Sequence, residues 1–182
     1  MARAKARIAR ADWIELGLHL LAKRGPEALT LERLTEAAGK TRGSFYHHFE
    51  DHPDFLGALA ERWREETDSA IAEAEAAAAA GRRRETLARR SAKIDHALER
   101  ELRRLAASEP IIAAAVAEVD ERRINYVARL FRAELGLDAN EALARARIQH
   151  CAFVGAQMVF PDADERFRLK LEAALGRTLW RK

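Results

Sequence analysis

Residues 30–49 read Thr-Leu-Glu-Arg-Leu-Thr-Glu-Ala-Ala-Gly-Lys-Thr-Arg-Gly-Ser-Phe-Tyr-His-His-Phe, and this stretch decides the fold. Thr30 can cap a first helix, because its hydroxyl can accept a hydrogen bond from a free backbone N–H. Gly39 can take the positive φ that ends a helix, and Thr41 is placed to cap the next one. The stretch therefore predicts two short helices joined by a sharp turn.

The second of these helices is expected from about Arg42 to His47, and its residues divide into two groups. Phe45 and Phe49 are spaced to point inward. The other side chains carry hydrogen-bond donors that a packed core does not accommodate: Lys40, Thr41, Arg42, Ser44, Tyr46, His47 and His48. Gly43 lacks a side chain, so the backbone can lie close against another surface such as the DNA major groove. This division predicts a helix-turn-helix.

These residues resemble the DNA-binding domain of the tetracycline-repressor (TetR, AcrR-like) family of bacterial transcription regulators. The resemblance rests on Leu-Thr-Glu-Ala-Ala-Gly at 34–39 and Thr-Arg-Gly-Ser-Phe-Tyr-His-His-Phe at 41–49, with Gly25 and Thr30 upstream. It covers about residues 10–56.

Two positions depart from the family pattern. Thr35 stands where the family usually has alanine, and His52 stands where it usually has a lysine that contacts phosphate. A histidine would make that contact depend on pH, since histidine titrates near neutrality. A helical partner-binding protein that no longer binds DNA is therefore an open alternative.

The resemblance also implies roles for individual residues. Thr41 and Arg42 are expected to contact base edges, with Arg42 preferring guanine. The residues expected to contact phosphate and fix the register are Lys40, Ser44, Tyr46, His47 and His52, beside the close approach at Gly43. For Tyr46, an aromatic ring that closes the small core is the alternative.

The composition bounds the class of protein. The chain has 182 residues, 48% hydrophobic and 34% charged, with four prolines, nine glycines and a net charge of +3. Such a chain is expected to be soluble and all-α, and its mild positive charge permits nucleic-acid binding. One cysteine cannot form an internal disulfide, and we find neither an apolar run of about 20 residues nor a signal peptide. We therefore expect a cytoplasmic protein.

We expect two domains, a helix-turn-helix domain over 1–52 and a helical regulatory and dimerisation domain over 53–182. Residues 1–9 contain Arg3, Lys5 and Arg7. They are either a basic arm on DNA or a frayed terminus. The expected helices outside the motif are Arg10–Arg24, one from near His52 to as far as Gly81, Glu85–Ala107, Pro110–Leu135, Asp138–Phe160 and Ala163–Trp180. Arg82, Arg83 and Arg84 are interpreted as solvated surface whose charge interacts favourably with the dipole of the preceding helix, and a nucleic-acid-binding patch is the alternative.

The last two helices are joined by a short loop, so they should be antiparallel neighbours. In a C2 dimer this hairpin, packed on its copy, would bury apolar stripes, and the resemblance implies the same interface. The residues expected there are Ile148, Ala152, Gly155, Val159, Phe167, Leu171 and Leu175. Packing of these stripes only on the subunit's own helices is the alternative. Two recognition helices about 34 Å apart would read an inverted repeat.

The resemblance implies that residues 55–182 hold a small effector in a cavity between helices. The candidates combine bulk with a polar tip in otherwise apolar helices, and they are Trp63, His96, Tyr126, Phe131, His150, Phe153 and Gln157. For His96 and His150, ordinary surface or core histidines are the alternative.

An enzyme is the competing class, but the sequence has no phosphate-binding glycine loop, nucleophile elbow or helical zinc motif. His47, His48, Asp51 and His52 could be proposed as a metal cluster, but phosphate contact explains them better. We therefore predict a DNA-binding regulator with no cofactor and no metal.

Overall fold

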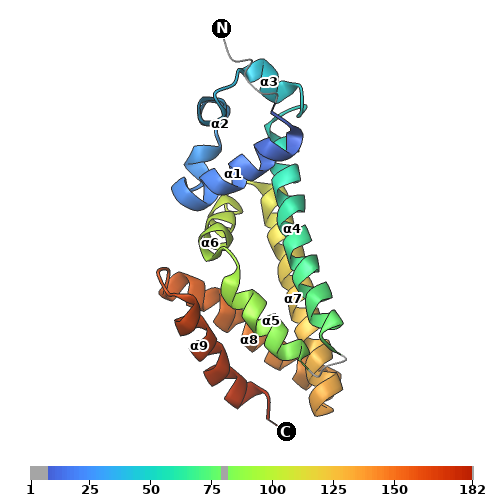
Figure 1. The fold of residues 1–182 in the computed structure, drawn as a ribbon. Helices are drawn as coiled ribbons and strands as arrows, with labels where there is room; N and C mark the ends of the chain where they lie inside the picture. Colours follow the sequence, from blue (N-terminus) through green and yellow to red (C-terminus); the bar gives the residue numbers. More distant parts are fainter. Residues whose placement is uncertain (1–7, 79–81, 182) are drawn as a thin grey trace.

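The computed structural model describes residues 8–78 and 82–181, which are helical and contain no strand (Figure 1). The elements are α1 (Arg10–Arg24), the 3-10 helix η1 (Pro26–Leu29), α2 (Leu31–Ala38), α3 (Arg42–Tyr46), α4 (His52–Ala76), α5 (Arg83–Lys93), α6 (His96–Leu105), α7 (Pro110–Leu135), α8 (Ala139–Val159) and α9 (Glu165–Leu179). The predicted all-α fold is confirmed. Most of the basic arm expected over residues 1–9 lies outside the described residues.

The turn between α2 and α3 forms through the predicted local interactions. The Thr30 hydroxyl accepts a hydrogen bond from Arg33 N at 3.4 Å. Gly39 has a left-handed φ of 59° and ends α2. The Thr41 hydroxyl accepts from Ser44 N at 3.3 Å and caps α3. Two caps and one glycine thus define the helix-turn-helix.

An aromatic cluster supports α3 from below. The ring of Phe45 lies 5.5 Å from Trp13, 5.0 Å from Phe49 and 5.4 Å from Phe55, centroid to centroid. All four side chains are buried, which confirms that Phe45 and Phe49 point inward. The Arg10 guanidinium lies 4.8 Å from the centroid of the Phe49 ring, so α1 contacts this cluster through both Trp13 and Arg10.

Helix α1 packs unusually close to α4 because residue 17 is glycine. A Cβ atom at Gly17 would lie 2.6 Å from Cζ of Phe55 and 3.2 Å from Cδ2 of Leu59. No side chain fits there without displacing those residues. The close contact joins the head, α1–α3, to the first half of α4.

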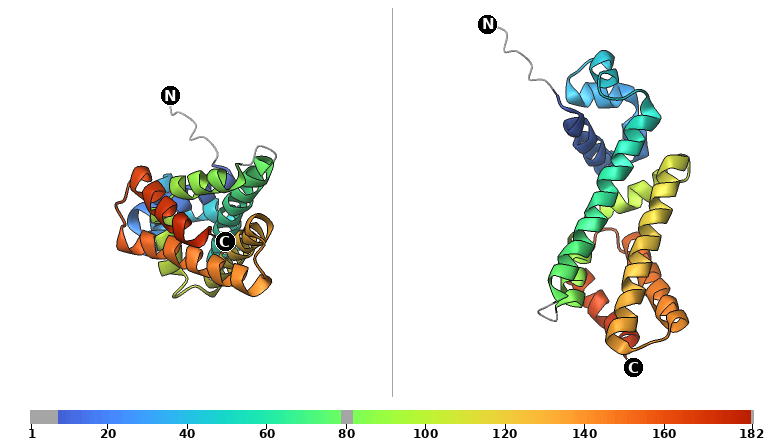
Figure 2. Two further views of the ribbon diagram at one scale, coloured as in Figure 1. Left: turned by 90° about the horizontal axis from the view of Figure 1, so that it is seen from below. Right: turned by 90° about the vertical axis from the view of Figure 1, so that its right-hand side faces the viewer.

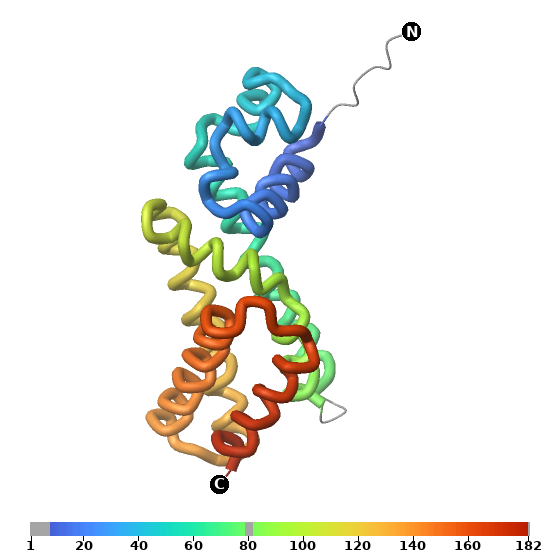
Figure 3. Tube along the Cα trace, turned by 90° about the vertical axis from the view of Figure 1, so that its left-hand side faces the viewer, coloured from blue at the N-terminus to red at the C-terminus, as the bar shows by residue number. Residues whose placement is uncertain are grey.

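The body below the head is built on two long helices, α4 and α7, that run side by side (Figures 1 and 2). Helix α6 lies between the head and the α8–α9 hairpin and contacts both α1 and η1 (Figure 3). One hydrophobic cluster extends from Trp13 through Phe55 to Leu102 and Val119. The core is therefore continuous across the domain boundary expected after residue 52.

Two expected helices were wrong in extent. The single helix expected over 85–107 is two helices, α5 and α6. Ile94 is extended, with ψ of 161°, and the Asp95 carboxylate accepts from Leu98 N at 3.0 Å to start α6. Helix α4 ends at Ala76, short of the end expected near residue 81, although the alanines beyond it favour helix. Residues 79–81 lie outside the described residues.

The later helix boundaries follow the sequence closely. Gly136 adopts a left-handed φ of 71° at the end of α7. The Asp138 carboxylate accepts from the backbone of Asn140 and Glu141 at 2.8 and 3.0 Å and starts α8. Helices α8 and α9 then form the expected pair joined by a short turn.

Candidate DNA-binding face and ligand cavity

Helix α3 presents its polar residues away from the aromatic cluster. Thr41, Arg42 and Gly43 are exposed, and Lys40 and Ser44 are half-buried. The Arg42 guanidinium forms no hydrogen bond or ion pair with any residue that the structure describes, so it is available to a partner outside the chain. A Cβ at Gly43 would meet only Thr41 Oγ1, at 3.8 Å. The surface around Gly43 is therefore open to a closely approaching molecule.

Tyr46 and His47 extend this face. Tyr46 is 53% exposed, although one edge of its ring contacts Phe45 at a centroid distance of 5.6 Å. Most of the ring thus faces solvent and does not close the core. His47 is exposed, with its ring 4.9 Å from that of His48.

His52 lies at the first turn of α4 and is half-buried. Its Nε2 is 2.8 Å from the carbonyl oxygen of Leu29, which requires Nε2 to carry a proton and donate. In the neutral ring Nδ1 is then an acceptor, which repels phosphate oxygen. A phosphate contact from Nδ1 therefore requires the doubly protonated imidazolium.

The neighbouring His48 is engaged by the backbone of α1's N-terminal flank. His48 Nε2 is 3.0 Å from the Ile8 carbonyl oxygen, which ties the end of α3 to the start of α1. Across residues 8–78 and 82–181, no three His, Cys, Asp or Glu side chains are grouped to hold a metal ion.

A cavity of about 550 Å³ lies among α4, α5, α6, α7, α8 and α9, and it also reaches Leu18 and His19 of α1. Four predicted effector residues line it: Trp63, Tyr126, His150 and Phe153.

The other three candidates do not line the cavity, and each has its own surroundings. The ring of His96 lies 6.1 Å from that of Phe153, centroid to centroid, and its Nε2 is 3.3 Å from the Ala92 carbonyl oxygen. Burial lowers the pKa of His96, and nearby Arg168 lowers it further. The ring of Phe131 packs on that of Trp180, with a centroid distance of 4.2 Å, and belongs to a separate hydrophobic cluster. Gln157 is fully buried in α8. A bulky side chain with a polar tip is therefore not enough to predict that a residue lines the cavity.

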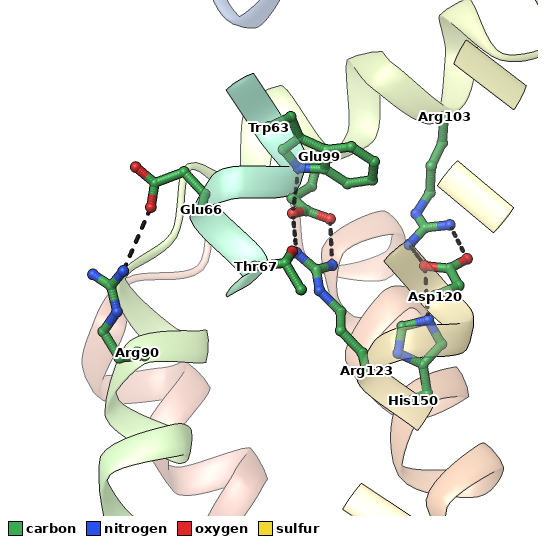
Figure 4. Close-up of polar contacts among 9 residues, drawn as sticks. All are labelled: Trp63, Glu66, Thr67, Arg90, Glu99, Arg103, Asp120, Arg123 and His150. Atoms are coloured by element: carbon green, nitrogen blue, oxygen red, sulfur yellow. Dashed lines mark hydrogen bonds and ion pairs between the residues drawn. The ribbon is translucent and has the colours of Figure 1, made fainter. Parts of the chain in front are cut away.

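One wall of the cavity is a buried polar network that the sequence analysis missed (Figure 4). The Glu99 carboxylate accepts from Trp63 Nε1 at 2.9 Å and from Arg123 at 2.9 and 2.7 Å. Arg123 also donates to Thr67 Oγ1 at 3.1 Å. Burial by itself would raise the pKa of Glu99, but the Arg123 and Trp63 donors lower it below its ordinary value. The network links α4, α6 and α7 and leaves Glu99 ionised.

A second network lies beside it. Asp120 of α7 accepts two hydrogen bonds from Arg103 of α6, at 2.8 and 2.7 Å, and lies 3.0 Å from His150 Nε2 of α8 (Figure 4). Burial opposes ionisation of Asp120, yet Arg103 and His150 hold its pKa well below the ordinary range. Asp120, which is itself paired with Arg103, thus orients the cavity-lining His150.

The opposite end of the cavity is formed by α8, α9 and the C-terminal tryptophan. Gln149 Nε2 donates to Glu172 Oε1 at 3.1 Å, and Trp180 Nε1 donates to Gln149 Oε1 at 3.3 Å. The Arg84 guanidinium covers the Trp180 ring at 4.9 Å. Arg84 therefore lines the cavity, and its side chain is also exposed, in agreement with the solvated-surface expectation. Burial and the nearby Glu75 carboxylate raise the pKa of Tyr126 to about 12.

The α8–α9 hairpin exposes large apolar side chains. Among the residues expected at a dimer interface, Ile148 is 53% exposed, Val159 67%, Phe167 40% and Leu171 36%. Met158 and Phe160 add to this surface. Ala152 and Gly155 are half-buried, and Leu175 packs on the subunit's own core. Self-packing therefore explains Leu175 but leaves most of the stripe uncovered.

Comparison with known proteins identifies the head. The model of the family "Bacterial regulatory proteins, tetR family" matches residues 14–59. The HTH-type transcriptional repressor AcnR of Corynebacterium glutamicum is 41% identical over 51 residues, which are 28% of this chain and 27% of the repressor. The match thus spans about a quarter of that relative's length.

Solved structures extend the likeness to the whole chain. A transcriptional regulator from Rhodococcus sp. Rha1 superposes with a TM-score of 0.75 at 15% identity, over 95% of this chain and 97% of that one. Regulatory protein TetR from Rhodobacter sphaeroides gives a TM-score of 0.57 at 24% identity, over 94% and 96%. At 15% and 24% identity these structures show that the fold is shared, and the family model matches only residues 14–59. Together they confirm the resemblance found in the sequence: residues 14–59 match the tetR family of bacterial regulatory proteins, and the whole chain has the fold of such regulators.

Proposed function

We propose that the protein is a homodimeric transcriptional repressor that binds an inverted-repeat operator through α3 and is released by a small-molecule effector. The observation that carries the proposal is the exposed polar face of α3, held on the buried ring of Phe45 within a matched tetR-family segment. Thr41 and Arg42 would read base edges, because they are exposed at the start of α3. Lys40, Ser44, Tyr46 and His47 would contact phosphates and fix the register.

Domain roles follow from the same arrangement. Residues 1–52 would bind DNA, and residues 53–182 would dimerise and bind the effector. Regulators of this family are generally DNA-binding proteins and not enzymes, and we propose no catalytic role. No helix in the described part of the chain is long and apolar enough to cross a membrane. We propose that the protein works in the cytoplasm, where its DNA target lies.

The dimer would form through the exposed apolar surface of α8 and α9. Side chains such as Ile148, Val159 and Phe167 leave much of their area in water in the isolated subunit. Burying such area against a second copy is favourable by about 25 cal/mol per Å². Open space above Gly155 leaves room for the partner's helix to approach.

Release from DNA would begin at the cavity and reach the head through α1, α4 and α6. Trp63 of α4 and Glu99 of α6 share a cavity wall, and Leu18 of α1 lines the same space. The far end of α6 contacts the head, where Arg104 donates to Glu27 at 3.1 Å. A ligand that prefers a different spacing of these helices would shift the separation of the two recognition helices and lower operator affinity.

The test is selection of bound sites from a random DNA pool with purified protein at moderate salt. Enrichment of an inverted repeat is the expected result. Affinity for the selected site should fall steeply with added salt, because phosphate contacts release counterions. A folded, dimeric protein that enriches no sequence, with or without candidate effectors, would favour the partner-binding alternative.

A further inference from the structure

We propose that the cavity binds an organic cation, with an apolar body between the aromatic walls and a protonated amine held by Glu172. The inference rests on the proposed function, because it names the chemical class of the effector.

Glu172 is a cavity carboxylate oriented only by a neutral donor. Its Oε1 accepts from Gln149 Nε2 at 3.1 Å, and Gln149 is itself fixed by Trp180 Nε1 at 3.3 Å. No hydrogen bond or ion pair joins Oε2 to any residue in the described ranges. One lone-pair-bearing oxygen therefore remains for a ligand that donates a proton.

Three of the other four carboxylates that line the cavity have cationic partners, and the fourth, Asp95, is exposed and caps α6 by accepting from Leu98 N. Glu99 is paired with Arg123 at 2.7 Å, and Glu66 is paired with Arg62 at 3.5 Å and Arg90 at 3.4 Å. Glu172 has no such partner among the described residues. An incoming positive charge is thus best compensated at Glu172.

Arg84 is a cation near Glu172, but it is directed elsewhere. Its guanidinium covers the Trp180 ring at 4.9 Å and forms no ion pair with Glu172 within the described structure. Burial raises the pKa of the Glu172 carboxyl, and Arg84 only partly opposes this effect. The surroundings therefore penalise the negative charge, and a ligand cation would relieve that penalty.

The rest of the cavity suits the body of an organic molecule and not a bare metal ion. Its volume of about 550 Å³ is within the range of small-molecule pockets. Apolar and aromatic side chains contribute to the lining, including Ile71, Leu87, Tyr126, Val127 and Phe153. Among the described residues, no three His, Cys, Asp or Glu side chains are grouped so that they could hold a metal ion.

The test compares three ligands that share one ring system and differ in charge: 1-naphthylmethylammonium, 1-naphthylmethanol and 1-naphthylacetate. Their affinities for the purified full chain, without DNA, are measured by isothermal titration calorimetry. The ammonium should bind about tenfold or more tightly than the alcohol, and the acetate should bind most weakly.

Two variants locate the charge preference. Glu172→Gln keeps the size of the side chain and the acceptor for Gln149, and it should reduce ammonium affinity about tenfold while leaving alcohol affinity within about twofold. Glu66→Gln removes an equal charge from the same cavity, but from a carboxylate that is already paired. It should reduce ammonium affinity by less than about threefold. Thermal unfolding checks that both variants are folded.

Equal affinities for the three ligands, a preference for the acetate, or no binding of the ammonium up to millimolar concentration would overturn the proposal. An equal loss of ammonium affinity in both variants would also overturn it, because the preference would then come from the overall negative charge of the cavity and not from Glu172. None of these outcomes depends on operator binding. Failure of the DNA selection would instead count against the proposed function.

Discussion

The indole Nε1 of Trp63 donates a 2.9 Å hydrogen bond to the Glu99 carboxylate, which joins the middle of α4 to α6 inside the protein. Glu99 is only 3% exposed, and Arg123 neutralises it from α7. Three helices that contact the cavity are thereby held by one carboxylate. The spacing of α4 and α6, on which the proposed release depends, is set at this point.

Glu99→Gln should lower the free energy of unfolding by about 3 kcal/mol, because it leaves the half-buried Arg123 without its counterion and removes the ionised acceptor of Trp63 Nε1. Urea denaturation at neutral pH measures the loss. Glu141→Gln, which removes an exposed i,i+4 partner of Arg145, is the control and should cost less than about 0.5 kcal/mol. Similar losses of unfolding free energy in the two variants would show that the Glu99 network stabilises the fold no more than an exposed ion pair does.

The stability difference between wild type and Glu99→Gln should also depend on pH. The pKa of Glu99 lies below the ordinary glutamate value of 4.5, so its ionised form stabilises the fold above that pH. As the pH falls below 4.5 and through the folded-state pKa, this contribution is lost. The stability difference between wild type and Glu99→Gln should therefore shrink in acid, as followed by urea denaturation. A difference that is constant down to about pH 3 would contradict the assigned ion pair.

Arg42→Ala should relax discrimination at one base position of the operator by about 1–3 kcal/mol. Arg42 is exposed and unpaired within the described chain, so its removal should leave stability nearly unchanged. Repeating the DNA selection with the variant measures the base preference, and thermal unfolding provides the control. An unaltered preference at every position would remove Arg42 from the proposed base contacts.

Gly155→Leu should weaken the dimer at least about tenfold. A Cβ at this position meets nothing within 4 Å in the subunit, so the new side chain would clash only with a partner. Sedimentation across a concentration series measures dissociation. Ala72→Leu on the exposed side of α4 is the control. A dimer of unchanged affinity would place the interface elsewhere.

Operator affinity should rise roughly fivefold between about pH 8 and about pH 6 if His52 contacts phosphate as an imidazolium. The bond from Nε2 to Leu29 leaves only Nδ1 for phosphate, and Nδ1 can donate only when the ring is charged. The pH profile of His52→Gln is compared with that of wild type by fluorescence anisotropy. Identical pH profiles would exclude the His52 contact.

Part of the fold could be predicted because it depends on neighbours in sequence. Thr30, Thr41 and Asp138 cap helices through bonds to backbone two or three residues away, and Gly39 ends α2 through its own φ. These interactions form wherever the chain carries those residues. The division of α3 into a buried aromatic side and an exposed polar side also follows from helical spacing.

The cavity could be predicted only in part, because side-chain burial depends on which helices meet. Glu99 and Glu172 resemble ordinary charged residues of amphipathic helices, and nothing local distinguishes them from exposed glutamates such as Glu141. The break at Ile94 separated α5 from α6 where periodicity predicted one helix.

The sequence by itself therefore determined most of the helices, their main caps, the recognition motif and the family resemblance, since these depend on contacts within a few residues or on the motif as a whole. Only the tertiary structure decided which polar side chains line the cavity. Trp63, Glu99 and Arg123 come from three helices, and bonds between them exist only after those helices pack. The same packing keeps His96, Phe131 and Gln157 out of the cavity lining: Phe131 packs on Trp180, and Gln157 is fully buried.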